Sequence, residues 1–227
     1  IITIPVIALR GLTMLPEMTI SFDISRKKSI AAVEKAMVGD QRVCLVAQKD
    51  PEIMDPSLDQ LYHIGTVSYI KQLVKMPGGI VRVMAEGQER AELLDLDSTE
   101  PSLMGEVLFT QEQEADVDGA AAEAMSRILK EKLESYGHQH PKFAKEILPG
   151  MMVCEDRESL MLKMASDLPW DYRIRQAYLE EATLAGQYEV LLSNLIHEIE
   201  VSQIHRELQE KVKENIDKNQ KDYILRE

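Results

Sequence analysis

Several features typical of secreted, membrane-spanning or metal-binding proteins are scarce or absent in this 227-residue chain. It has only two cysteines, Cys44 and Cys154, which form neither a disulfide framework nor a closely spaced pair of zinc ligands. No stretch approaches the roughly 20 apolar residues that a membrane helix needs. The first ten residues, IITIPVIALR, lack the basic start and apolar run of a secretory signal. We therefore expect a cytoplasmic protein with no membrane partner.

Positive charge is also in short supply. The chain has 26 Lys and Arg against 39 Asp and Glu, a formal net charge of -13. A nucleic-acid partner is not expected, because binding phosphates requires clustered bases that displace counterions. Arg26, Lys27 and Lys28 form a compact basic run, which we interpret as a solvated helix start rather than a basic patch.

Motifs that carry catalysis or cofactor binding are missing or incomplete. The sequence contains no GxxxxGK[ST], GxGxxG or GxSxG pattern. HEIEV at 197–201 has Val201 where a zinc-protease helix has its second histidine. The HQH segment at 138–140 precedes Pro141 and is interpreted as an exposed loop rather than a metal cluster with Cys154. We expect no catalytic residue, no metal and no cofactor in this chain.

The first hundred residues contain short apolar runs separated by turn residues, a pattern typical of strands. Between two of these runs, MPGG offers Pro77 and two glycines that accept positive φ, so an antiparallel hairpin is predicted there. One helix, in SIAAVEKAMVGD, is predicted between strands, with Gly39 ending it. The predicted strands are 43–48, 64–74 and 80–87.

Helical periodicity takes over after a boundary that we place near 110–118. Asp118 is predicted to cap a helix that ends at Gly137. Two further helices are predicted at about 156–167 and 171–185. Gly186 is predicted to separate them from a long final helix. The inner stripe of the Asp118 helix is predicted to be Ala121, Met125, Ile128, Leu133 and Tyr136. The fold class is thus α+β, with a β-rich lobe at 1–112, a helical lobe at 113–186 and a long helix at 187–227.

Five segments in order resemble the N-terminal region of bacterial Lon, the ATP-dependent serine protease family. They are IPVIALRGLTMLP, RKKSIAAVEKAM, VCLVAQKDPEIMDP, LYHIGTVSYIKQLVKMPGGIVRVMAEGQERAEL and the final KVKENIDKNQKDYILRE. The resemblance implies a PUA-like pseudo-barrel, a helical lobe and a connector helix that continues into an AAA+ module. It also implies a non-catalytic domain that captures unfolded, damaged or degron-bearing proteins and helps a hexamer assemble. ATP and magnesium would belong to the parent protein, an ATP-dependent serine endopeptidase. The alternative is a free-standing PUA-like module for RNA or a small ligand.

Candidate binding residues follow from apolar patterning. Alternation in the predicted hairpin separates one face with Val74, Met76, Ile80 and Met84 from another with Leu73, Val81, Val83 and Ala85. Methionine suits varied partners because it is flexible and polarizable, so the first face is the candidate substrate patch. Burial of the hairpin on both sides is the alternative. A second candidate is Met14, Leu15 and Met18 around Pro16, which core or strand-end packing explains equally well. In the long helix, Ile204, Leu208, Val212 and Ile216 form a narrow stripe that we expect to contact another copy.

Overall fold

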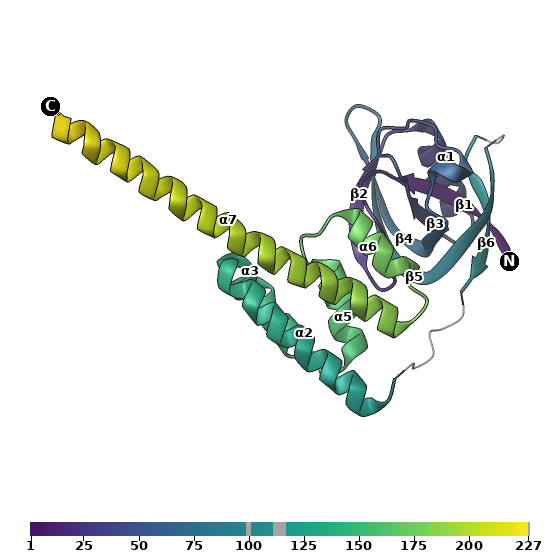
Figure 1. Cartoon of the computed structure of the whole chain (residues 1–227). Helices are drawn as coiled ribbons and strands as arrows, with labels where there is room; N and C mark the ends of the chain where they lie inside the picture. Colours follow the sequence, from purple (N-terminus) through teal and green to yellow (C-terminus); the bar gives the residue numbers. More distant parts are fainter. Residues whose placement is uncertain (99–100, 111–116, 227) are drawn as a thin grey trace. The chain divides into compact units, whose positions relative to one another are not determined.

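The computed structural model describes residues 1–98, 101–110 and 117–226 and divides the chain into two compact units. The sheet unit consists of Ile1–Ala115 and Leu168–Gln187, and the helical unit of Asp116–Asp167 and Tyr188–Glu227 (Figure 1). This division differs from the predicted one in that 168–187 joins the sheet and the last 40 residues join the preceding helices. Most of the predicted boundary at 110–118 lies outside the described residues.

The sheet unit is built from six strands within its described part, in the order β2-β5-β4-β3-β1-β6. Because β5 also pairs with β6, the strands from β5 to β6 close into a ring and β2 is attached outside it. The expected mostly β start followed by helices is confirmed. The elements are β1 (Ile2–Leu9), β2 (Thr19–Ile24), α1 (Lys27–Val38), β3 (Arg42–Ala47), η1 (Leu58–Gln60), β4 (Ile64–Met76), β5 (Ile80–Asp97) and β6 (Met104–Phe109).

Strands β1 and β3 run parallel and are buried on both faces, which explains their near-continuous apolar sequence. Along β1, Ile7 and Leu9 pack into one apolar cluster with α1, while Val6 and Ala8 pack into a second cluster on the other face. The side-chain period of two in a strand produces this division.

The predicted hairpin is confirmed as β4 and β5. Gly78 and Gly79 form its turn with φ of +80° and +74°, values that side chains with a Cβ rarely adopt. Farther along β5, a Cβ on Gly87 would lie 2.1 Å from the backbone oxygen of Leu15. Glycine therefore lets the segment before β2 approach β5 closely.

Helix α6 (Tyr172–Glu180) belongs to the sheet unit, a placement that the sequence did not predict. Gln176 donates from Nε2 to the Ile64 carbonyl at 2.9 Å, and the Tyr172 hydroxyl donates to the Gln48 carbonyl at 3.1 Å. Helical periodicity identified the helix but could not indicate which apolar core it covers.

The helical unit begins with α2 (Gly119–Gln139), capped as predicted by Asp118, whose carboxylate accepts the Ala121 N–H at 2.7 Å. The predicted stripe was wrong at Ile128, which is exposed, and missed the buried Leu129. The helix also continues past Gly137. Three shorter helices follow: α3 (Pro141–Glu146), α4 (Leu148–Met152) and α5 (Arg157–Asp167), of which only α5 was predicted.

The last helix, α7 (Leu184–Arg226), has 43 residues. Gly186 lies inside it, so the prediction of a break there was wrong. Leu191 and Leu195 are fully buried, whereas every residue from Gln203 to Arg226 is exposed. The helix therefore changes from a packed first half to an exposed second half, and the narrow apolar stripe expected from the sequence lies in the exposed part.

Candidate substrate-binding surface

The two faces of the β4–β5 hairpin differ sharply in burial. Leu73 pairs with Val83, and both contact the core that includes Ala85. The opposite face carries Val74, which is 41% exposed, and the half-buried Met84. Met76 and Ile80, paired next to the turn, are half-buried on that same outward face. The register therefore groups Val74, Met76, Ile80 and Met84 as predicted and excludes burial of the hairpin on both sides; we call these four residues the hairpin patch.

A charged pair accompanies the hairpin patch. Arg82 of β5 donates from Nε and Nη2 to the two carboxylate oxygens of Asp23 on β2, at 2.8 and 3.1 Å. The guanidinium lowers the pKa of the Asp23 carboxyl, and the carboxylate raises the pKa of Arg82. The outward face thus combines apolar side chains with a paired charge.

The second candidate cluster is not available for binding. Met14 is 1% exposed and Leu15 is fully buried, so core packing, the alternative explanation, is correct for both and they are not surface binding residues. Met18 is half-buried and packs against the same core as Met14. Next to Pro16, Glu17 adopts a φ of +64°.

The stripe on α7 is exposed as expected. Ile204, Leu208, Val212 and Ile216 are between 52 and 57% exposed. Three of them line a shallow groove of about 480 Å³ together with His205, Gln209 and Lys213. Its contact with another copy remains a prediction.

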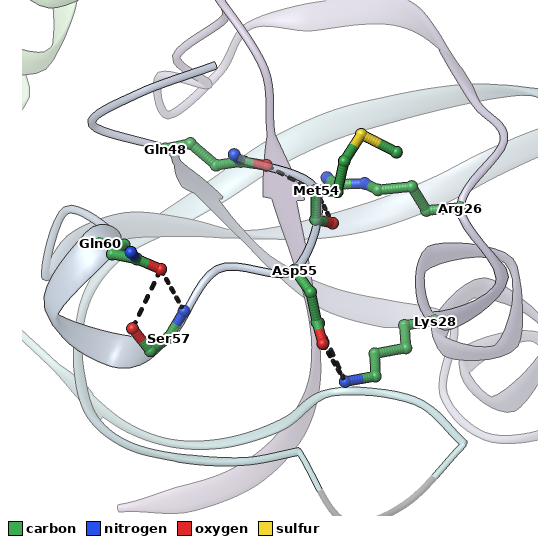
Figure 2. A network of polar contacts seen from close by, with 7 residues as sticks. All are labelled: Arg26, Lys28, Gln48, Met54, Asp55, Ser57 and Gln60. Atoms are coloured by element: carbon green, nitrogen blue, oxygen red, sulfur yellow. Dashed lines mark hydrogen bonds and ion pairs between the residues drawn. The ribbon is translucent and has the colours of Figure 1, made fainter. Parts of the chain in front are cut away.

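The basic run was only partly interpreted correctly. Lys27 is exposed, but Arg26 is half-buried and extends over the loop that follows β3 (Figure 2). Its Nη1 donates to Gln48 Oε1 at 2.7 Å and to the Met54 carbonyl at 3.3 Å, and its Nη2 donates to the Ala8 carbonyl. Arg26 therefore joins three segments of the sheet unit.

The neighbours of Arg26 complete this network. Gln48 is fully buried, and its Nε2 donates to the carbonyls of Asp50 and Ile53. Lys28 pairs with Asp55 at 2.9 Å (Figure 2). Burial, with a smaller contribution from Arg10, lowers the pKa of Arg26. These bases are held by internal partners, which is why they do not form a free basic patch.

Among the histidines singled out in the sequence, His140 has structural partners. His140 stacks on Tyr136 with ring centroids 3.9 Å apart, and its Nδ1 lies 2.9 Å from the Tyr136 carbonyl. Within the described ranges, no group of three or more His, Cys, Asp or Glu could hold a metal. Burial raises the pKa of Cys44 to about 12, so it stays a thiol. The part of the chain that the structure describes also contains no helix long and apolar enough to cross a bilayer.

Residues 3–197 match the family model for the ATP-dependent protease La (LON) substrate-binding domain. The chain belongs to this Lon substrate-binding domain family. It is 41% identical over 224 residues to a Lon protease of Lachnoclostridium phytofermentans, and 34% identical over 224 residues to one of Brevibacillus choshinensis. Each alignment covers 99% of this chain and 28% of the relative. The chain thus spans about 28% of the length of these curated Lon proteases.

Two solved structures of Lon N-terminal domains share the fold of this chain. The N-terminal domain of a Mycobacterium avium complex Lon protease superposes with a TM-score of 0.67 at 19% identity, covering 85% of this chain and 97% of that one. A Lon N-terminal domain protein from Xanthomonas campestris superposes with a TM-score of 0.60 at 17% identity, covering 85% and 98%. The fold implied by the sequence resemblance is confirmed.

Strand β2, which lies beside the hairpin patch, was missed by sequence reasoning. Its sequence, TISFDI, alternates polar and apolar residues, which is the signal that could have identified it. Ser21 on β2 faces Met84 across the ladder, so residues of β2 share the outward face with the patch.

Proposed function

We propose that this chain is the non-catalytic substrate-recognition and assembly domain of an ATP-dependent Lon protease. It captures unfolded, damaged or degron-bearing proteins for ATPase and protease modules elsewhere in the parent protein. The proposal is supported by membership of the Lon substrate-binding domain family and by the relatives, which are Lon proteases more than three times as long. The parent protein would use ATP and magnesium in the cytoplasm and work as a hexamer.

The observation that carries the proposal is the outward hairpin patch. A domain that accepts many unfolded chains needs apolar side chains that adapt to different partners, and methionine supplies this flexibility. Met76 and Met84 lie half-buried on a face whose reverse side is anchored in the core. The anchored strand pair therefore presents flexible side chains. Because these side chains adapt, the backbone does not have to be reorganised when a client binds.

Assembly and capture support each other physically. A single patch of four side chains provides weak binding, and several tethered copies raise the effective concentration of sites. The exposed α7 stripe of Ile204, Leu208, Val212 and Ile216 is the surface through which copies would meet. Within the described residues this stripe is not covered by the chain's own helices, which leaves it available to a partner.

The test is an NMR titration of the ¹⁵N-labelled chain with reduced, carboxymethylated α-lactalbumin, an unfolded protein. Met84→Asp should weaken binding about tenfold or more, because it places a charge in the apolar contact. Met54→Asp is the matched control, since Met54 is 63% exposed on a loop outside the patch. Equal binding by the wild type and Met84→Asp would remove the patch from the proposal, and no binding by the wild type would refute the capture function.

A further inference from the structure

We infer that the free edge of β2 binds an extended segment of unfolded polypeptide as an additional antiparallel or parallel strand. This inference rests on the proposed function and specifies how the client backbone is held. Strand β2 is the end member of the strand order, and β5 is its one strand partner within the described residues. In Figure 1, β2 lies at the margin of the strands, and its ladder partner is β5.

The direction of the β2 backbone groups follows from the bonds at its start. The Glu17 N–H donates to the Gly87 carbonyl and the Gly87 N–H donates to the Met18 carbonyl, both at 2.8 Å. Met18 therefore occupies a hydrogen-bonded position opposite Gly87. Antiparallel ladders alternate hydrogen-bonded with non-hydrogen-bonded pairs, and the register continues without a shift to Ile24 opposite Val81.

This alternation assigns two sets of backbone groups. Ile20, Phe22 and Ile24 direct their N–H and C=O groups toward β5. Thr19 and its alternate neighbours Ser21 and Asp23 direct theirs to the free edge, and all three residues are exposed. The free edge thus offers donors and acceptors at a two-residue repeat. An extended polypeptide presents the matching repeat regardless of its sequence, so the chemistry of this edge selects the peptide backbone.

Common protections of an edge strand are weak here. Natural edges are blunted by lysines, prolines, bulges or inward-pointing charges. The segment Thr19–Ile24 contains no proline or lysine, and its one charge, Asp23, is paired with Arg82 on the side away from the free edge. The positive φ of Glu17 marks a bulge that limits the edge at one end. Within the described residues, the backbone groups of Thr19, Ser21 and Asp23 therefore remain open to pairing.

The edge is continuous with the hairpin patch. Ser21 lies opposite Met84, so a strand added beyond β2 would be two strand spacings, roughly 10 Å, from β5. Alternate side chains of that strand would share the outward face with Met84. The others would lie beside Ile20 and Phe22, which are half-buried. Backbone pairing supplies affinity for any extended client. The side chains on the two faces of the sheet favour clients that have apolar residues at alternate positions.

The deciding variant is Ser21→Pro in the full 227-residue chain. Proline removes a free-edge N–H and places a ring there, while the bonds between β2 and β5 do not use the Ser21 N–H. Ser21→Ala is the matched control, because it changes the side chain and keeps the N–H. In the α-lactalbumin titration, Ser21→Pro should bind at least about tenfold more weakly than the wild type, and Ser21→Ala should bind equally.

Two peptide measurements keep the inference testable if Ser21→Pro does not fold. A decapeptide alternating valine with threonine should protect the amide hydrogens of Thr19, Ser21 and Asp23 from exchange. N-methylation of one set of alternate residues of that peptide should abolish binding, whereas N-methylation of the other set should leave binding intact. The inference would be overturned if both N-methylated peptides still bound, or if these amides gained no protection from exchange.

The outcomes separate this inference from the proposed function. If the wild type binds α-lactalbumin and Ser21→Pro binds it equally, the edge plays no part although the capture function stands. If the wild type binds no unfolded protein, the proposed function fails first. A wild-type dimer that Ser21→Pro dissociates, without peptide binding, would assign the edge to a second copy and overturn the inference.

Discussion

The guanidinium of Arg90 on β5 donates to the last carbonyls of α6, from Nε to Leu179 at 2.6 Å and from Nη2 to Glu180 at 3.0 Å. The C-terminal carbonyls of a helix lack partners within the helix and carry partial negative charge. One side chain of the sheet therefore caps a helix about 90 residues later in the chain. This contact helps explain why α6 belongs to the sheet unit.

Removing this cap should destabilise the sheet unit. Arg90→Met is expected to lower the free energy of unfolding by about 1.5 to 3 kcal/mol, the range for hydrogen bonds from a charged donor. Lys75→Met, at an exposed position of the hairpin, should change it by less than about 0.5 kcal/mol. Urea unfolding followed by the fluorescence of Trp170, the single tryptophan and a buried residue of the sheet unit, measures both. Equal stability of the two variants would contradict a capping role for Arg90.

The Arg26 network provides a second test with an adjacent control. Arg26→Ala leaves Oε1 of the buried Gln48 without its 2.7 Å partner and removes the bond to the Ala8 carbonyl, so a loss of about 2 to 3 kcal/mol is expected. Lys27→Ala, at the next and exposed residue, should cost less than about 0.5 kcal/mol. The same urea transitions decide, and a Lys27→Ala variant as unstable as Arg26→Ala would show that the effect comes from charge rather than from these bonds.

Methionines at buried and outward positions should respond differently to truncation. Met14→Ala creates a cavity in the core and should cost about 2 to 5 kcal/mol, whereas Met84→Ala on the outward face should cost less than about 1 kcal/mol. Denaturant unfolding of both variants and the wild type measures these losses in the free energy of unfolding. A small loss of stability for Met14→Ala together with a large loss for Met84→Ala would contradict the assignment of Met14 to the core and Met84 to the outward face.

The ion pair between Asp23 and Arg82 predicts a specific pH response. Because the pKa of Asp23 is lowered from its ordinary value of 3.8, the pair stabilises the fold above that pH. This stability is lost as the pH falls below 3.8 through the pKa of the folded state. A ¹³C NMR titration of the carboxyl group should give a value below 3.8, and Arg82→Ala should return it toward 3.8. An unchanged pKa in Arg82→Ala would show that another group causes the shift.

Much of the local structure could be predicted because its causes lie within a few residues. Gly78 and Gly79 indicated the hairpin turn, and Asp118 indicated a helix start. The alternation along the hairpin also placed Val74, Met76, Ile80 and Met84 together. What failed locally was the end of α2 and the supposed break at Gly186, because packing and neighbouring residues can hold a glycine in a helix at modest cost.

The sequence by itself determined the family, the α+β order of elements and the two-sided pattern of the hairpin, since each depends on residue identity and spacing along the chain. Only the tertiary structure decided that Met14 and Leu15 are buried, that Arg26 is held internally, that α6 packs on the sheet, and that β2 has β5 as its one strand partner within the described residues. These facts depend on which distant segments meet. A strand's pattern of alternation indicates two faces, but the number of its neighbours depends on how the whole sheet closes.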